Sequence, residues 1–567
     1  MKILQRALPC LLFVVAFVAF LPALAGQFLN WDDDINFLGN PSFRGLGWAQ
    51  LRWMWTTTLM GHYIPLTWMS LGLNYALGGM NPWGYHLGNM LLHATNTVLV
   101  YFVARRLLIA AGISTGLSLL WSAGFAGLVF GIHPLRVESV AWVTERRDVL
   151  CGLFFLLAVL TYLGSLDATA RRGWRLASIA AFGAAFLCKA QVAPLPVALL
   201  ILDAYPLRRV VGVGWRHLVM EKLPYFAVSM IGSVIAIIAV KKGGLFTDYA
   251  QYGPAARLAM TAYGILFYPW KWLWPTGLSP LYELPARVDP LAWRFLLPII
   301  ALAVVTGFLL AFRRYWPAGL AAWAYSAVML LPLVGPLHSG NQLAHDRYSY
   351  LSGLGFAVLA GAGLAWVFQA AARGTLRPLI GQISLAGAGL VLLGLGSATW
   401  IQAGGWRDSE TLWSWAVEMD PQCAICLNNL ALTLTSRGQA GDAEQAFRRS
   451  LALRERAMTR NNLGGVLQIQ GRLDEAEREY QGALRQDPRL REALVNLGEL
   501  YGKQGRYEEA LPLLRRAFQV SPDVPRLRTN LGQALRRRGA ALAQIGKPEE
   551  AQALLREALQ VQPSLGH

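Results

Sequence analysis

The chain has 567 residues, of which 55% are hydrophobic and only 15% are charged. Soluble domains average about 25% charged residues, so a row of ordinary soluble domains is excluded. The apolar content excludes a disordered chain, and five cysteines in this length exclude a disulfide scaffold. The net charge of +18 does not indicate nucleic-acid binding, because Lys and Arg also gather at the cytoplasmic ends of membrane helices. The composition predicts a membrane protein.

The first apolar run covers residues 7–25 and follows Lys2 and Arg6, so its start is expected in the cytoplasm. Residues 23–26 resemble a signal-peptidase site, but we expect the run to remain as an uncleaved first helix. Apolar runs of about 17–25 residues, long enough to cross a hydrocarbon core of about 30 Å, recur until Gly404. The sequence therefore predicts a membrane domain over residues 1–404.

Basic clusters that mark cytoplasmic turns separate the further apolar runs. These runs predict helices over residues 87–108, 117–135, 149–166, 222–240, 292–312, 317–336, 349–371 and 379–402. Around Lys189, prolines interrupt the apolar sequence, which predicts two short helices that dip in and return. The Trp-rich segment 258–275 is expected at the membrane surface or as a re-entrant helix. This scheme has eleven crossings and places the C-terminal region outside the cytoplasm. Four basic residues then also lie outside the cytoplasm, against the usual charge bias.

Beyond Gly405 the long apolar runs stop and a charged, helical period begins. Asn-Leu pairs recur 33, 34 and 34 residues apart, with small residues and prolines at matching offsets. Residues 405–567 are therefore predicted to form a tetratricopeptide α-solenoid, in which small residues let paired helices pack closely. The last turn glycine, Gly546, comes about seven residues late, so we expect a helix lengthened by two turns rather than a broken repeat.

Solenoids of this kind bind extended peptides on their concave side. Side-chain amides repeated along that side can hydrogen-bond a peptide backbone, because each offers a donor and an acceptor. The alternative is that Asn is simply common at this place in the repeat. The candidate acceptor-binding residues are Asn429, Asn462, Asn496 and Asn530.

Three adjacent carboxylates, Asp32, Asp33 and Asp34, follow the first helix. They repel one another, so at least one is expected to have a raised pKa. A carboxylate at the rim of the membrane can take the proton of an acceptor hydroxyl or bind a divalent cation. The alternative is a solvated acidic turn. Asp33 and Asp32 are the candidate catalytic residues, and a metal requirement stays open.

A second polar segment, GIHPLRVESVAWVTERRDVL, lies between two apolar runs, where ionisable residues indicate function by default. Arg suits phosphate because its fork donates two parallel hydrogen bonds. A lone Lys in an apolar hairpin is expected to be neutral, to snorkel or to hold an anion, and a lipid phosphate is the obvious anion. The alternative for this segment is an ion-paired loop. A further polar segment, HSGNQLAHDRYSYL, contains Arg347, and its alternative is interfacial anchoring. The candidate donor-binding residues are Lys189, Arg146, Arg147, Arg347, His133 and Glu138.

The Cys423-x-x-Cys426 motif has too few neighbouring ligands for zinc, and haem attachment would need His in place of Leu427. We expect two packed free thiols. A local disulfide in an oxidising compartment is the alternative.

Taken in order, the motifs resemble a known family. They are FLNWDDD, HYIPLTW, NPWGYHLGNMLLH, HPLRVESVAWVTERRDVL, LCKAQVAPLPVALLILDAYPLRR and AHDRYSYL, followed by the repeats. The chain resembles the tetratricopeptide-bearing membrane O-mannosyltransferases and their bacterial relatives, within the GT-C class of polyprenyl-phosphate-sugar-dependent glycosyltransferases. One departure is that relatives often read Y-R-P-L where this chain reads Tyr63-Ile64-Pro65-Leu66.

The resemblance implies an all-α fold, a polytopic GT-C membrane bundle followed by the solenoid, with the active site on the non-cytoplasmic face of a bacterial plasma membrane. By position, the family's acidic pair falls on Asp32 and Asp33, one of them the base. The family's remaining polar positions fall on His133, Glu138, Arg146, Arg147, Asp148 and Lys189.

The implied reaction moves a sugar, mannose or another hexose, from a polyprenyl-phosphate carrier to Ser or Thr of an exported protein, with inversion. Lys189 with Arg147 or Arg347 would hold the phosphate, and the repeats would present the acceptor. Two alternatives stay open: an O-oligosaccharide ligase that uses a pyrophosphate-linked glycan, and a non-enzymatic membrane scaffold. A transporter is less well supported, because the charges cluster at one membrane face.

Overall fold

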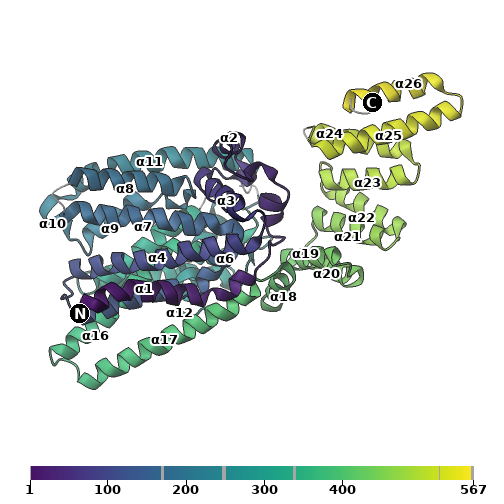
Figure 1. Ribbon diagram of the computed structural model, residues 1–567. Coiled ribbons are helices and arrows are strands. Elements are labelled where there is room, and N and C mark those ends of the chain that lie inside the picture. The colour runs from purple at the N-terminus through teal and green to yellow at the C-terminus, as the bar shows by residue number, and fades with distance from the viewer. Residues whose placement is uncertain (1, 168–170, 245–250, 336–339, 523, 563–567) are drawn as a thin grey trace. The chain divides into compact units, whose positions relative to one another are not determined.

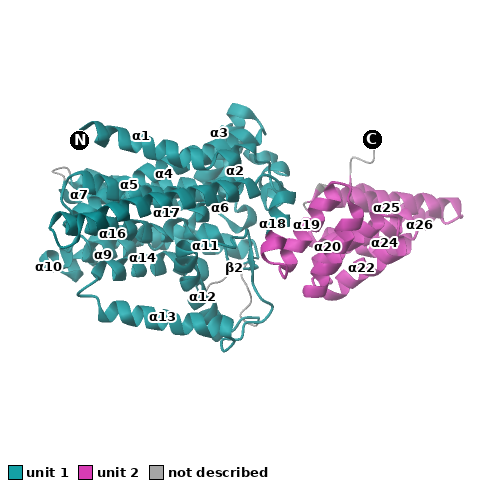
Figure 2. Cartoon of the chain, turned by 90° about the horizontal axis from the view of Figure 1, so that it is seen from below, with its two compact units in different colours: residues 1–415 teal, residues 416–567 magenta. Residues whose placement is uncertain are grey.

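A computed structural model describes residues 2–167, 171–244, 251–335, 340–522 and 524–562. These residues are mainly helical, with two short strands among them. The chain divides into two compact units, Met1–Trp415 and Ala416–His567 (Figure 2). The predicted all-α fold with a tetratricopeptide region is confirmed.

The first unit is a bundle of long helices joined by short ones (Figure 1). Its early helices are α1 (Lys2–Ala19), α2 (Trp48–Thr56), α3 (Pro65–Gly78), α4 (Pro82–Ala110), α5 (Leu117–Gly131), α6 (Val137–Ala141), α7 (Arg146–Asp167), α8 (Arg171–Phe186) and α9 (Leu195–Ala204). Its later helices are α10 (Arg209–Val213), α11 (Trp215–Lys242), α12 (Pro254–Leu273), α13 (Trp293–Ala311), α14 (Pro317–Val334), α15 (Ser349–Ser352), α16 (Leu354–Ala372) and α17 (Pro378–Gly405). Helix α18 (Ser409–Met419) contains the division between the units.

Within the described residues, eight helices are long and apolar enough to span a membrane, and a bent pair makes a ninth. The eight are α1, α4, α7 with the turn before it, α11, α13, α14, α16 and α17. The bent pair is Leu117–Gly131 with Pro134–Ala141, which meet at 53°. The other two expected crossings fall on α8 and α9, which are shorter helices on either side of Lys189. Eleven crossings therefore remain a prediction, while each expected helix is present.

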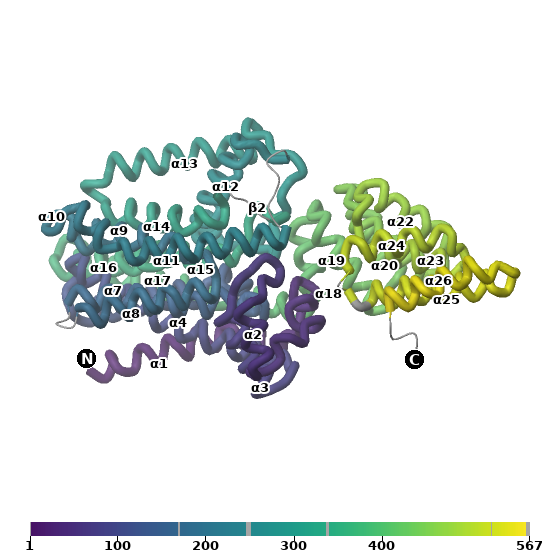
Figure 3. The backbone as a smooth tube through the Cα atoms, turned by 90° about the horizontal axis from the view of Figure 1, so that it is seen from above, coloured from purple at the N-terminus to yellow at the C-terminus, as the bar shows by residue number. Residues whose placement is uncertain are grey.

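Helices α1, α4 and α7 lie side by side, and α4 packs against both of the others (Figure 3). Strands β1 (Tyr282–Glu283) and β2 (Gln342–Ala344) pair antiparallel, with Tyr282 opposite Ala344. This pairing matters for the site, because β2 leads directly into the HDRY segment. Segment 258–275, predicted at the surface or as a re-entrant helix, forms α12, which is not among the candidate spans of the described residues.

The second unit consists of antiparallel helix pairs (Figure 1). They are α19 (Ala424–Ser436) with α20 (Ala440–Leu453), α21 (Ala457–Ile469) with α22 (Leu473–Gln486), α23 (Arg491–Lys503) with α24 (Tyr507–Val520), and α25 (Pro525–Gln544) with α26 (Pro548–Val561). Helix α25 has 20 residues where α23 has 13, so the predicted lengthening by two turns is confirmed. Each pair turns at a glycine with φ of 77–79°, a left-handed conformation that ends helices and favours glycine.

Small residues allow the paired helices to approach closely, as the repeat pattern predicts. A Cβ added to Gly464 would lie 2.7 Å from the Tyr480 ring, and one added to Gly498 would lie 2.8 Å from Leu514. These contacts leave no room for a methyl group.

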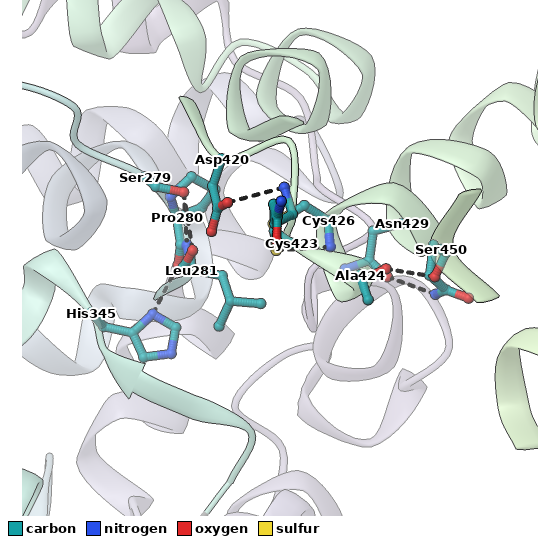
Figure 4. The surroundings of a disulfide bond; sticks show 12 residues. Ser279, Pro280, Leu281, His345, Asp420, Cys423, Ala424, Cys426, Asn429 and Ser450 are labelled. Atoms are coloured by element: carbon teal, nitrogen blue, oxygen red, sulfur yellow. Dashed lines mark hydrogen bonds between the residues drawn. A yellow bond between two sulfur atoms is a disulfide. The ribbon is translucent and has the colours of Figure 1, made fainter. Parts of the chain in front are cut away.

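Cys423 and Cys426 form a disulfide at the start of α19, so the expectation of two free thiols is wrong (Figure 4). The physical reason is local: Cys423 is the N-cap residue, and Cys426 lies one helical turn later, where side chains three apart are neighbours. The Cα atoms are 5.2 Å apart, within the usual range for a disulfide.

Thiol labelling of the denatured protein tests this disulfide. Without reductant, we expect maleimide to label Cys10, Cys151 and Cys188, which are free thiols. After reduction, two further cysteines should be labelled. An unchanged number of labelled thiols after reduction would show that Cys423 and Cys426 are not bonded to each other.

Candidate active site

Asp33 is a fully buried carboxylate that is held by three hydrogen bonds. Oδ2 accepts from the Leu29 amide at 3.0 Å, while Oδ1 accepts from the Thr144 amide at 3.1 Å and from the Thr144 hydroxyl at 2.6 Å. Burial raises the pKa of Asp33 to about 7, although these hydrogen bonds oppose the shift. Asp33 therefore joins the loop after α1 to the turn before α7, and its oxygens already have partners.

Unlike Asp33, Asp32 has an available carboxylate. It is only partly buried, and its side chain has no hydrogen-bond partner among the described residues. Burial raises the pKa of Asp32, while the nearby guanidinium groups of Arg147 and Arg347 lower it, and the net shift is upward. Its backbone has a φ of 67°, in the left-handed region that Asp and Asn tolerate better than most residues. Asp34 is exposed and begins a short π-helical turn.

Six charged side chains meet close to Asp32 and are called the ion cluster here: Glu138, Glu145, Arg147, Asp148, Lys189 and Arg347. Glu145 lies at its centre. Its carboxylate contacts Arg147 Nη2 at 2.6 Å, Lys189 Nζ at 2.9 Å and Arg347 Nε at 3.0 Å.

The remaining bonds of the ion cluster extend it to both sides. Lys189 Nζ lies 2.7 Å from Asp148 Oδ1, and Glu138 pairs with the guanidinium of Arg347 and accepts its backbone N–H at 2.9 Å. His345 Nδ1 lies 3.2 Å from the same Glu138 carboxylate. Burial lowers the pKa of Arg347, but Glu138 and Glu145 more than offset this, and the net pKa is raised. Arg347 therefore stays charged.

Several breaks in the helices bring these side chains together. Glu138 lies on α6, after the bend at Pro134, and Glu145 and Arg147 lie where α7 begins. Lys189 lies in the break between α8 and α9. That break is fixed to α3, because the Leu66 amide donates to Leu187 O at 3.2 Å and the neighbouring Thr67 hydroxyl donates to Cys188 O.

The cluster is balanced, with three carboxylates against three cations. Lys189, Arg147 and Arg347, the cations predicted to hold a phosphate, are each paired with a carboxylate. Arg147 uses Nε and Nη2 on Glu145, which leaves Nη1 for another acceptor. Among the described residues, Lys189 makes two of the three bonds that an ammonium can donate. Donors therefore remain for an anionic ligand.

Two predicted donor-binding residues point elsewhere. Arg146 bonds to Asn89 and donates Nη2–H to Tyr85 O at 2.7 Å, so it fixes α7 to α4. His133 accepts the Leu135 amide at 3.2 Å and stacks on Trp272. Neither side chain joins the ion cluster.

The four candidate asparagines of the repeats bond to neighbouring polar side chains. Asn462 and Asn496 each donate to an Asn of the preceding repeat, which favours a structural role. The pairs are Asn428–Asn429 at 3.1 Å, Asn462–Asn428 at 3.2 Å, Asn496–Asn461 at 2.9 Å, and Asn530–Glu499.

Comparison with known proteins finds matches to the repeats and to most of the chain. Tetratricopeptide-repeat family models match residues 423–458, 455–521 and 489–564. The chain is 24% identical over 597 aligned positions to the protein O-mannosyl-transferase TMTC2 of Mus musculus, covering 81% of this chain and 68% of that protein. It is 24% identical to Tmtc3 of Drosophila melanogaster, covering 83% of this chain and 59% of that protein. The chain is similar to tetratricopeptide-bearing protein O-mannosyltransferases.

Other matches are shorter. The TMTC2 protein of Homo sapiens is 37% identical over 26% of this chain and 17% of that protein. The crystal structure of MamA matches 28% of this chain and 88% of that chain at 19% identity, with a TM-score of 0.24.

This O-mannosyltransferase-like chain also has a residue near the ion cluster that sequence reasoning missed. This residue is His62. It follows Met60 and Gly61, which both have positive φ. It lies shortly before Leu66 and Thr67, whose hydrogen bonds fix α3 beside Lys189. Burial, then the charges of Arg147 and Lys189, lower the pKa of His62 to about 3, so its imidazole is neutral. The signal in the sequence that could have identified His62 was its polar side chain within the motif HYIPL.

The same motif explains the departure at Ile64. Its side chain is buried in an apolar cluster with Phe37, Phe43 and Trp68. A side chain at this position lies in that cluster, so Ile64 completes its apolar packing.

Proposed function

We propose that this chain is a GT-C-type protein O-glycosyltransferase. It transfers a sugar, mannose or another hexose, from a polyprenyl-phosphate carrier to Ser or Thr hydroxyls of exported proteins. The observation that carries the proposal is the position of the Asp32 carboxylate, which has no hydrogen-bond partner among the described residues, beside the fixed cations Arg147 and Arg347. Similarity to protein O-mannosyltransferases along most of the chain supports the reaction class.

An apolar groove beneath the ion cluster supports a lipid-linked donor. The cavity has a volume of about 110 Å³ and lies between α4, α7, α9, α14 and α16. Phe155 lines it and follows Asp148 on α7 by seven residues, or roughly 10 Å along that helix. Leu195 also lines it and begins α9, six residues after Lys189. A carrier with its phosphate at the ion cluster could therefore place its isoprenoid chain in this groove.

In the proposed reaction, the acceptor oxygen attacks the anomeric carbon from the face opposite the phosphate. The bond between that carbon and the phosphate oxygen breaks, and its electron pair stays on the polyprenyl phosphate. Asp32 receives the proton of the hydroxyl as general base. Lys189 and Arg147 stabilise the negative charge that builds on the phosphate. The anomeric centre is inverted.

The repeats would bind the acceptor chain. A cavity of about 280 Å³ in the second unit is lined by Asn530, Lys503 and Arg537, which offer hydrogen bonds and positive charge beside Glu499. The asparagines of the other repeats contribute rigidity through their mutual bonds. The disulfide between Cys423 and Cys426 supports an oxidising, extracytoplasmic location for this unit.

Reconstitution tests the proposal. The purified protein in liposomes should transfer one hexose from polyprenyl-phosphate mannose to a Ser/Thr peptide, and the intact mass of the peptide should rise by one hexose. A larger increase from a pyrophosphate-linked glycan would favour the ligase alternative. Loss of envelope assembly without transfer from any carrier would favour the scaffold.

The pH dependence of transfer follows from Asp32. A base acts only when it is deprotonated, and the pKa of Asp32 is raised above its ordinary value. Transfer is therefore expected to fall with decreasing pH, with a midpoint above the pKa of about 3.9 of a free Asp, and to level off at higher pH. Initial rates across the pH range measure this. A rate that stays constant down to pH 4 would contradict the assignment.

A further inference from the structure

Helices α4 and α7 carry a second polar region far from the ion cluster. Arg105 lies sixteen residues after Asn89, the residue that bonds to Arg146, and Asp167 lies nineteen residues after Asp148. At 1.5 Å per residue these separations are about 24 Å and 29 Å. The hydrocarbon core of a bilayer is about 30 Å thick. Arg105 and Asp167 therefore lie at the level of the lipid headgroups of the opposite leaflet.

A cavity of about 500 Å³ lies between the two helices at this level. Its apolar wall includes Phe102 and Ile109 from α4 and Leu163 and Leu166 from α7. Its polar lining consists of Arg105, Arg106 and Asp167. A volume in this range is typical of sites for small molecules. The combination of an apolar wall and cationic groups matches an amphiphile with an anionic head.

The charges of this cavity are not balanced. Arg106 pairs with Asp167 at 3.0 Å, whereas no carboxylate pairs with Arg105 among the described residues. The Nε atom of Arg105 is buried and has no hydrogen-bond acceptor in the described part of the chain. A buried donor without an acceptor is unfavourable. A phosphate oxygen would satisfy it and would neutralise the excess charge.

We propose that this cavity binds the headgroup phosphate of an anionic phospholipid, with Arg105 as the main contact. Basic pockets between membrane helices bind such headgroups, and the guanidinium fork matches phosphate geometry. Arg313 and Arg314, which follow α13, are exposed and do not line this cavity. They therefore provide a matched control for basic residues that serve topology alone.

Native mass spectrometry of the full chain from bilayers of phosphatidylglycerol and phosphatidylcholine tests the proposal. We expect the wild type to retain phosphatidylglycerol selectively, and Arg105→Gln/Arg106→Gln to reduce retention at least fivefold. Arg313→Gln/Arg314→Gln should retain the wild-type amount. Ala110→Phe, which fills the cavity and keeps both arginines, should also reduce retention.

Other outcomes would overturn the site. Equal loss in the Arg105/Arg106 and Arg313/Arg314 variants would show a general charge effect, and equal retention of phosphatidylcholine would show no headgroup selection. Displacement of the lipid by millimolar inorganic phosphate, with phosphate retained instead, would assign the pocket to a free anion. None of these measurements depends on transferase activity.

Discussion

Replacing Asp32 with Asn is expected to lower sugar transfer by at least about 100-fold, the contribution typical of a general base. Asn has nearly the same shape but does not accept the proton of a hydroxyl. Because the Asp32 side chain has no hydrogen-bond partner among the described residues, the substitution should leave the fold and donor binding intact. Single-turnover transfer with saturating donor measures the chemical step separately from binding.

The neighbouring aspartates are the matched controls. Asp34→Asn changes an exposed side chain, so transfer should stay within about twofold of the wild type. Asp33→Asn should lower the thermal stability of the protein, since its carboxylate accepts three buried hydrogen bonds. Wild-type transfer by Asp32→Asn, together with loss of transfer in a stably folded Asp33→Asn protein, would move the base to Asp33.

The substitution Glu145→Gln is expected to have the largest effect on stability. Glu145 is fully buried and contacts Arg147, Lys189 and Arg347. Removing its charge leaves three cations facing two carboxylates, and breaking a buried ion pair costs about 3–5 kcal/mol. We expect a marked fall in the thermal unfolding temperature of the protein in detergent or lipid.

The exposed pair Arg106–Asp167 provides the comparison for that experiment. Asp167 is largely solvent-exposed, so Asp167→Asn should change the free energy of unfolding by less than about 1 kcal/mol. If Glu145→Gln has no larger effect than Asp167→Asn, the ion cluster is not a structural centre. Partial recovery of Glu145→Gln by polyprenyl phosphate would indicate that the ligand's charge replaces the missing carboxylate.

Local patterns predicted the fold well. The recurring Asn-Leu pairs predicted the helix pairs, and the late position of Gly546 predicted the length of α25. Both features are determined by residues within one helical turn or one repeat. The prolines after Lys189 predicted the break between α8 and α9. The disulfide of Cys423 was also within reach, since residues three apart are neighbours at the start of a helix.

The partners within the candidate site were out of reach for the sequence. Asp33 bonds to Thr144 across 111 residues, and Glu138 pairs with Arg347 across 209 residues. No periodicity links residues so far apart. Three adjacent aspartates look equivalent in the sequence, and only tertiary packing distinguishes the buried Asp33 from the available Asp32.

The left-handed backbone of Asp32 has a consequence for mutational surveys. With a φ of 67°, this position suits Gly, Asn and Asp, whereas Ala carries a steric penalty there. An alanine scan would therefore combine two effects at this residue, a strained main chain and a missing carboxylate. Glycine and asparagine substitutions made side by side would separate the two, and a saturation library should be enriched in these residues among its folded members.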